Sequence, residues 1–395
     1  MALSVRRADG VQTTRERRTE ERHDPPPAPA AAAPLVSPVN SHNEWDPLEE
    51  VIVGRLDGAT IPPHDAAVSV TMPPWAARMH GLAAAAPFRY PRRLVEPAQQ
   101  ELDGFVELLE SLGITVRRPD PVDHRRPYAT PDWTSRGFAN SCPRDSLLVI
   151  GDEIIETPMA WPCRYFETHS YRTVLKDYFR RGARWTAAPK PQLTDALYEP
   201  DFRPARDGEP VRRIVTEFEP VFDAADFVRA GRDLFVTPSN VTNRMGIEWL
   251  RRHLGPGYRI HEIESRCHTP MHIDTTFLPL APGRALVNPE YVDVDRLPPV
   301  LDSWDILIAP EPDPISERLL KFTSICGKWL SMNVLVIDGE RVIADRHHTG
   351  MLRALETWGF DPIPCDLLHY APFGGSFHCA TLDVRRRGTL DSATA

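Results

Sequence analysis

The sequence lacks the features that mark membrane, nucleic-acid-binding and disulfide-linked proteins. No apolar run approaches the roughly 18–20 residues that cross a bilayer. The formal net charge of −9 argues against a nucleic-acid-binding surface, which is normally basic. Six cysteines are scattered along 395 residues without a CxxC pair, which predicts free thiols in a reducing compartment. We therefore expect a cytoplasmic protein with neither membrane nor nucleic-acid partners.

Nucleotide and metal motifs are lacking as well. The glycines at 374 and 375 have neither the lysine nor the spacing of a phosphate-binding loop. His347-His348 and the other histidines show no metal-ligand spacing. The arginine run 385–387 is interpreted as a solvated strand end. The chemistry of this chain must therefore come from other side chains.

The chain is long enough for one large or two ordinary domains. Hydrophobic residues make up 42% and charged residues 26% of it, which is typical of a globular protein. Residues 1–38 differ, because mixed charge and a run of proline and alanine predict a disordered tail. A transit peptide is the alternative, but this segment carries acidic residues that such peptides avoid. We interpret residues 39–395 as a single domain.

Helices and strand–turn–strand patterns alternate from Asn43 onward. Apolar residues at helical spacing predict helices over 95–112, 165–179, 246–254 and 351–358. Paired strand-like runs with Gly or Asp near the turn predict hairpins over 146–156, 227–236, 275–287 and 333–344. A fifth unit would pair strand 378–384 with strand 50–54.

Recurrence of one unit predicts a closed, propeller-like α/β array, with an ordinary α/β sandwich as the alternative. The polar residues of interest fall at the entries to these units. In a ring, equivalent ends of all units converge on one axis, so residues far apart in the sequence would share one pocket.

Cys379 is the candidate nucleophile. A free cysteine is more often a small buried hydrophobe, and Cys142, Cys163, Cys326 and Cys365 are interpreted that way. Cys379 differs because the preceding glycines, Gly374-Gly375, allow unusual backbone angles and close approach of a ligand. A bound cationic substrate would also favour its thiolate.

Candidate acid–base and cation-binding groups lie elsewhere in the chain. His272 and Asp274 are two residues apart, so in a strand they would face the same way, either to carry protons or to satisfy each other. Asp223 would hold a guanidinium group, whose N–H donors suit carboxylates, or would cap a helix starting at Ala224. Asp145 would do the same, or would pair with its neighbour Arg144 or cap the end of a strand.

Six motifs stand out together. They are Asn43–Val51, Cys142–Asp145, Glu219–Ala225, Met271–Asp274, Lys328–Asn333 and Gly374–Cys379, the last followed by Asp383–Arg386. With them, residues 40–392 resemble the arginine-dependent amidinotransferases, which include arginine:glycine amidinotransferase and the inosamine-phosphate amidinotransferases. The resemblance implies a pentein-like fold, a pseudo-fivefold propeller of ββαβ units with the active site on its axis.

The resemblance also implies roles for the residues of the motifs. Cys379 would attack the guanidinium carbon of L-arginine and pass the amidino group to an acceptor amine, with ping-pong kinetics. His272 would protonate the departing ornithine, and Asp223 would orient His272. Asp145 and Asp274 would hold the guanidinium nitrogens, and Met271 belongs to the same substrate site. No metal or organic cofactor is implied, and a homodimer is a family expectation.

Two positions depart from the family pattern. Members commonly carry an arginine after the Asn-Pro of the third unit, where this chain has Tyr291. A Ser-Ser pair expected before Lys-Trp is replaced by Cys326-Gly327. Both positions would grip substrate groups other than the guanidinium. We therefore expect a specialised acceptor amine from a biosynthetic pathway, with glycine still open.

Two other functions stay open from the sequence. Related guanidine-modifying enzymes pass the intermediate to water and are hydrolases. A catalytically silent relative would serve as a binding protein. The motifs at 44–51 and 328–333 favour transfer, and the presence of Asp145, Asp223, His272 and Cys379 together argues against a silent relative.

Overall fold

The computed structural model describes residues 36–63, 65–71, 77, 89–314 and 327–390. Residues from Val36 onward belong to one compact unit. The predicted tail, residues 1–38, lies outside the described residues except for its last three, so its disorder stays a prediction. Within the described part of the chain, no helix is both long enough and apolar enough to span a membrane.

Five three-stranded sheets with one pairing scheme form the framework. In each, the middle strand pairs antiparallel with one neighbour and parallel with the other. In spatial order, the sheets are β17 (Thr381–Arg386), β1 (Leu48–Val53) and β2 (Thr115–Arg117); β5 (Leu147–Ile150), β6 (Glu153–Glu156) and β7 (Arg184–Ala187); β8 (Phe227–Ala230), β9 (Asp233–Val236) and β10 (Arg259–Glu262); β11 (Phe277–Ala281), β12 (Arg284–Val287) and β13 (Asp305–Ile308); and β14 (Leu335–Val336), β15 (Arg341–Asp345) and β16 (Asp361–Cys365). A short hairpin, β3 (Pro127–Ala129) and β4 (Thr134–Arg136), is separate from them.

A helical connection joins each pair of parallel strands. In four sheets it contains an α-helix, and in the fourth sheet along the chain it contains two 3-10 turns. These elements are α3 (Arg92–Ser111), α5 (Arg172–Arg180), α6 (Arg244–Leu254) and α8 (Thr349–Thr357), with η7 (Val294–Arg296) and η8 (Pro299–Leu301). The short helix α1 (Ala66–Ser69) lies between β1 and α3, and the short helix α4 (Pro143–Ser146) precedes β5.

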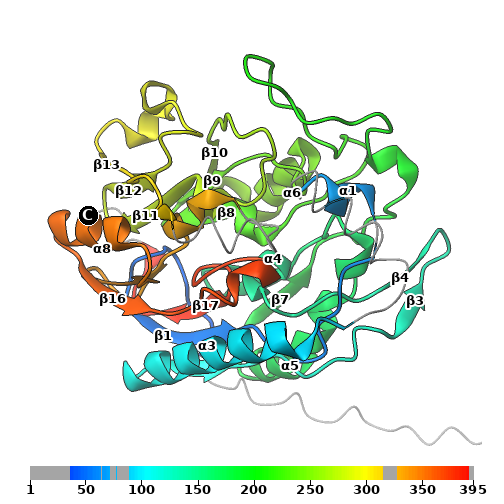
Figure 1. Ribbon diagram of the computed structural model, residues 1–395, viewed down its shortest axis with the longest axis horizontal. Helices are drawn as coiled ribbons and strands as arrows, with labels where there is room; N and C mark the ends of the chain where they lie inside the picture. Colours follow the sequence, from blue (N-terminus) through cyan, green and yellow to red (C-terminus); the bar gives the residue numbers. More distant parts are fainter. Residues whose placement is uncertain (1–35, 64, 72–76, 78–88, 315–326, 391–395) are drawn as a thin grey trace, which may run out of the picture. The chain divides into compact units, whose positions relative to one another are not determined.

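The predicted helices and hairpins are confirmed, with small changes at their ends. The helix predicted over 165–179 begins as a 3-10 helix, η2 (Glu167–Tyr171), before α5. The strand predicted from residue 275 begins only at Phe277. The strand pairing between the two ends of the described chain is also confirmed, because β17 and β1 lie side by side (Figure 1). The fold is therefore α/β, and the five sheets are separate rather than one closed sheet.

Helix α3 connects the fold to the turn that carries Cys379. Its residues Leu102, Phe105 and Leu109 recur at intervals of three and four, and all three are fully buried. The ring of Phe105 meets that of Phe377 edge to face, with centroids 5.3 Å apart. Such a pair contributes about 0.5–1.5 kcal/mol beyond simple burial. Because Phe377 is two residues before Cys379, this contact fixes the nucleophile turn against the core.

The segment before β1 crosses three sheets. Isolated bridges join Asn40 to Arg385, Ser41 to the turn at Gly151, and Asn43 to Ala230. This segment thereby brings the side chain of the next residue, Glu44, into the interior, where it is 2% exposed.

Candidate active site

One cavity of about 100 Å³ collects most of the predicted site residues. Its lining includes Cys379, His272, Asp145, Asp274, Met271, Tyr291 and Gly327. Asp223 lies behind His272 rather than in the lining. Cys326 lies outside the described residues, so nothing is concluded about its role.

These residues occupy equivalent places in the five units. Asp145 lies in α4 just before β5, and Asp223 precedes the 3-10 turn η4 (Ala224–Asp226) that leads into β8. Asp274 lies in η6 (Ile273–Thr275) before β11, and Asn333 follows η9 (Lys328–Met332) before β14. Cys379 stands just before β17. Each sheet thus contributes one of these residues from the segment that leads into its first strand, as the sequence predicts.

Two glycines shape the turn that holds Cys379. Gly374 has φ of +117°, a backbone angle that residues other than glycine rarely adopt. A Cβ added at Gly375 would lie 2.3 Å from the Cβ of Cys379 and 2.8 Å from its sulfur. Gly375 is therefore required because the side chain of Cys379 itself lies so close. The sequence predicts that a ligand, rather than Cys379, approaches this glycine.

Asn333 and Asp274 hold the sulfur of Cys379. The side-chain amide of Asn333 donates to Sγ at 3.1 Å, and its Oδ1 accepts from the backbone N–H of Cys379 at 3.1 Å. The thiol in turn donates to Oδ2 of Asp274 at 3.2 Å. The sulfur is thus oriented from two sides and lines the cavity.

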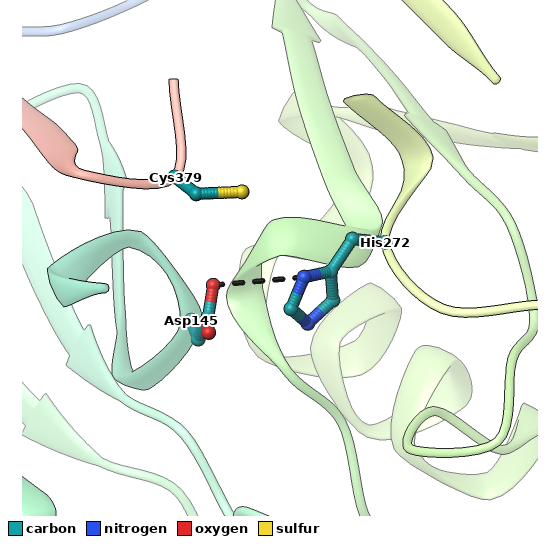
Figure 2. Close-up of side chains that lie close together, drawn as sticks. All are labelled: Asp145, His272 and Cys379. Atoms are coloured by element: carbon teal, nitrogen blue, oxygen red, sulfur yellow. Dashed lines mark ion pairs between the residues drawn. The ribbon is translucent and has the colours of Figure 1, made fainter. Parts of the chain in front are cut away.

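His272 lies between two carboxylates. Its Nε2 is 3.2 Å from Oδ2 of Asp223, and its Nδ1 is 3.7 Å from Oδ1 of Asp145. Figure 2 shows Cys379, Asp145 and His272 pointing toward one another from separate elements. The prediction that His272 and Asp274 share a strand face is wrong, because His272 has φ of +61° and a 3-10 turn follows it. Both side chains nevertheless line the cavity.

The two carboxylates control the protonation of His272. Burial by itself would lower its pKa, but the charge of Asp145 and the hydrogen bond to Asp223 raise it to about 10. Burial raises the pKa of Asp223, and the hydrogen bond with His272 opposes that rise. At neutral pH, His272 is therefore a cation that can donate a proton into the cavity.

Arg164, from η1 (Pro162–Arg164), completes the charge balance of the site. It donates to Oδ2 of Asp145 at 2.8 Å, lies 3.6 Å from Asp223, and pairs with both oxygens of Glu167 at 2.6 and 2.7 Å. Burial would lower its pKa, but Glu167 and Asp145 raise it well above the usual value. One buried arginine therefore lies beside three buried carboxylates, those of Asp145, Asp223 and Glu167.

The alternative roles considered for the aspartates are wrong. Asp223 is at the N-cap position of η4, but its side chain makes no capping hydrogen bond. Asp145 does not pair with Arg144, which instead donates to Asp383 at 2.6 Å. His272 and Asp274 do not satisfy each other, because Asp274 accepts from His378.

A buried ionic network supports the far side of the site. Asp383 accepts from Arg144, Arg229 and Arg386 at 2.6, 3.0 and 2.7 Å, and Glu44 accepts from Arg229 at 2.8 Å. The interpretation of residues 385–387 as a solvated strand end is therefore wrong at Arg386, which is 1% exposed. Three arginines around two carboxylates form a fixed cationic frame behind the cavity.

His378 connects this network to the nucleophile. Its Nδ1 lies 2.9 Å from Oδ2 of Asp274, and its Nε2 lies 3.5 Å from Oε2 of Glu44. Burial would raise the pKa of Asp274, but the hydrogen bond with His378 lowers it. Asp274 is thereby held as a carboxylate beside the sulfur of Cys379.

The three groups in Figure 2 are also the only candidate metal cluster among the described residues. One ligand atom from each lies within 4.8 Å of the others. Because both ring nitrogens of His272 face carboxylates, the arrangement suits proton transfer better than metal binding.

Three important residues received no role from the sequence. Asn333 and His378 lie within recognised motifs, but amide and imidazole contacts cannot be assigned without the fold. Arg164 has only a local signal, the spacing of three residues to Glu167, which is common on any helical turn.

No family model matches the chain. An L-arginine:L-lysine amidinotransferase of Pseudomonas savastanoi pv. phaseolicola is 46% identical over 356 residues, which cover 90% of this chain and 96% of that protein. The mitochondrial glycine amidinotransferase of Gallus gallus is 45% identical over 372 residues, or 91% of this chain and 86% of that protein. Among solved structures, an amidinotransferase of the saxitoxin biosynthetic pathway from Microseira wollei matches with a TM-score of 0.83 and 53% identity, covering 89% of this chain and 98% of that chain.

Hydrolases are more distant. A dimethylarginine dimethylaminohydrolase matches with a TM-score of 0.51 and 15% identity over 85% of this chain and 99% of that chain. At this identity the likeness shows a shared α/β fold alone.

Proposed function

The chain belongs to the amidinotransferase family, and on that premise we propose that it transfers the amidino group of L-arginine to an acceptor amine through Cys379. The observation that carries the proposal is the meeting of Cys379, His272 and Asp145 at one cavity, with one atom of each within 4.8 Å of the others. A thiol, a proton donor and carboxylates are the groups that this reaction needs.

In the first half-reaction, the sulfur of Cys379 attacks the guanidinium carbon of arginine. Asp145 and Asp274 bind the guanidinium nitrogens, and the positive charges of the substrate and His272 favour the thiolate. The bond from the guanidinium carbon to the side-chain nitrogen then breaks. His272 gives its proton to that nitrogen, so ornithine leaves and an amidino-cysteine remains.

In the second half-reaction, the acceptor amine attacks the amidino carbon. His272, now neutral, takes the proton that the amine loses, and the carbon–sulfur bond breaks to return the thiolate. Asp223 keeps the imidazole oriented through both steps. One product leaves before the second substrate reacts, which gives ping-pong kinetics.

Tyr291 and Gly327 bear on which substrates fit. Both line the cavity, and a Cβ added at Gly327 would lie 3.7 Å from the hydroxyl of Tyr291. We propose that they contact the part of the substrate beyond its guanidinium, with Met271 beside them. A specialised biosynthetic amine is the proposed acceptor, and glycine and lysine are the first amines to test.

The proposal is tested by the mass of the intact protein after incubation with L-arginine alone. We expect an amidino adduct and released ornithine, and no adduct on Cys379→Ser. Cys163→Ser, a buried cysteine outside the cavity lining, should keep the adduct. Citrulline in place of the adduct would reject transfer in favour of hydrolysis.

We also propose that the five ββαβ units close into a ring around the cavity. The common strand order of the five sheets and the contribution of each unit from the same place support this arrangement. We further propose one domain over residues 39–395 after a disordered tail, a cytoplasmic location and a homodimer. Light scattering on the purified protein tests the dimer.

A further inference from the structure

A second, wider cavity adjoins the catalytic one. Its volume is about 1190 Å³, and it shares Cys267, Thr269 and Tyr291 with the cavity that holds Cys379. A substrate whose guanidinium or amine reaches the sulfur would extend past these three residues. The chemistry of the wide cavity therefore bears on the rest of the substrate.

The acidic side chains of the wide cavity already have partners. Their contacts are Glu209 with Arg203 at 2.7 Å, Glu262 with Arg244 at 3.4 Å, Glu264 with Arg296 at 2.7 Å, Glu290 with Lys328 at 2.7 Å, Asp207 with His268 at 3.7 Å, and Asp293 with the backbone N–H of Asp295 at 3.3 Å. Two of the four arginines that line the cavity, Arg244 and Arg296, are used in these pairs.

The other two arginines, Arg213 and Arg266, donate hydrogen bonds only to backbone oxygens within the described part of the chain. Arg213 donates from Nε to the carbonyl of Pro238 at 2.9 Å, and Arg266 donates from Nη2 to the carbonyl of Val292 at 2.9 Å. Among the described residues, no carboxylate oxygen lies within 4.0 Å of either guanidinium group. Burial and the nearby Arg244 lower the pKa of Arg213, and the charges of Glu262, Asp226 and Glu217, none of which forms an ion pair with it, offset that shift only in part. The remaining N–H groups are available to an anion.

Arg266 is also fixed next to Tyr291. Its backbone N–H donates to the carbonyl of Tyr291 at 2.7 Å, and its side chain holds the carbonyl of the following residue. The cation is therefore tethered to the segment that borders both cavities. Because a guanidinium presents a planar fork of donors, it matches a carboxylate well.

We propose that Arg213 and Arg266 form a binding site for the carboxylate of a substrate whose reacting nitrogen lies at Cys379. This inference deepens the proposed function and rests on it. Both an amino-acid donor and an amino-acid acceptor carry such a carboxylate, and the experiment distinguishes the two sources.

The test compares substrates that differ only in the carboxylate. Binding of L-arginine and of agmatine, its decarboxylated form, is measured by calorimetry on the Cys379→Ser protein, with and without Arg266→Gln or Arg213→Gln. Transfer to L-lysine and to cadaverine, its decarboxylated form, is measured on the same arginine variants with Cys379 intact. Loss of a charge-assisted contact should weaken binding about tenfold to a hundredfold, and only for the carboxylate-bearing member of the affected pair. An effect on arginine identifies the donor, and an effect on lysine identifies the acceptor.

Arg296→Gln is the matched control, because Arg296 lines the same cavity but forms an ion pair with Glu264. This variant should change neither the preference for L-arginine over agmatine nor the preference for L-lysine over cadaverine. Arg266→Lys should restore part of the discrimination by keeping the charge. Arg266 is exposed, so its variant should fold even if the part-buried Arg213 variant does not. Equal binding of both members of each pair, unchanged by Arg266→Gln, would overturn the site. If the wild-type protein forms no amidino adduct but Arg266→Gln still weakens arginine binding, the proposed function fails and the carboxylate site stands.

Discussion

Replacing Asp223 with asparagine separates the charge of this residue from its shape. The carboxylate is 1% exposed and lies 3.2 Å from Nε2 of His272. Asparagine keeps the volume and an oxygen that can accept from the imidazole, but it removes one of the three carboxylate charges, those of Asp145, Asp223 and Asp226, that raise the pKa of His272 to about 10. The change therefore tests whether Asp223 sustains the proton donor.

The size of the effect follows from the contacts. A hydrogen bond to a charged group contributes about 1.5–3 kcal/mol, and about 1.36 kcal/mol corresponds to one pH unit of a pKa. The pH at which His272 loses its proton should therefore fall by about one to two pH units. Since general acid catalysis contributes about 10²–10⁴-fold, a poorly oriented imidazole should lower kcat by about a hundredfold.

The pH dependence of the free energy of unfolding also reports the pKa of His272. The folded-state pKa of His272 lies above its unfolded value, so the stability that its protonation adds is fully present below about pH 6.5. That stability is lost as the pH rises through about 10. In Asp223→Asn, the loss should begin at lower pH.

The assay is ornithine release as a function of pH, with thermal unfolding measured over the same range. Asp226→Asn is the control, because Asp226 is equally buried but its Oδ2 accepts from Ser239 and Thr242, and it raises the pKa of His272 less than Asp223 does. Burial already raises the pKa of Asp226 to about 7, so an amide should be tolerated there. Asp223 does not sustain the proton donor if the fall in ornithine release at alkaline pH occurs at the same pH in Asp223→Asn as in wild type. The same conclusion follows if Asp226→Asn shifts that fall as far as Asp223→Asn does.

Other changes test the support of the site. Asp383→Asn leaves three buried arginine donors around a neutral amide and should destabilise the fold by about 3–5 kcal/mol in chemical denaturation, whereas Arg385→Gln at the half-exposed pair with Glu49 should change it by less than about 1 kcal/mol. Arg144 and Arg386 lower the pKa of Asp383 against the effect of burial, so its contribution to the free energy of unfolding is present above about pH 4 and lost on acidification. Equal acid sensitivity of Asp383→Asn and wild type would contradict this expectation. His378→Gln should shift the pH dependence of Cys379 alkylation by iodoacetamide while leaving the circular dichroism unchanged, and an unaltered profile would mean that His378 has no positioning role. Asn333→Ala should slow adduct formation about tenfold or more through loss of the contact to Sγ, and a normal rate would show that this contact is dispensable.

Much of the fold was predictable because local chemistry determines it. Gly151 and Gly283 both have positive φ values near +60° at hairpin turns, which glycine adopts without strain. Burial of both faces gives strands such as β5 and β11 continuous apolar character, so their positions are visible in the sequence. Recurrence of the hairpins then indicated that residues at equivalent entries would meet, and Asp145, Asp274 and Cys379 do meet.

The backbone at His272 was not predictable from residue type. A positive φ for a non-glycine residue is uncommon, and no sequence pattern distinguishes it from an extended strand start. The conformation is maintained by contacts from elsewhere, since Asp223 and Asp145 come from two other units. Strand periodicity therefore gave the wrong path for residues 272–276, although the side chains still reached the cavity.

The role of the consecutive arginines at the end of β17 depends on partners that are distant in the sequence. Arg385 pairs with Glu49 near the surface, whereas Arg386 reaches Asp383, the carbonyl of Asp46 and the carbonyl of Val336. Alternation along a strand predicts that neighbours face opposite ways, but it does not say which face is buried. A buried arginine persists only where carboxylates and carbonyls satisfy it, and here those acceptors come from three separate segments. The same network fixes Glu44, which reaches the catalytic cavity through His378 and Asp274, so the charge of the strand end and the orientation of the nucleophile are parts of one buried structure.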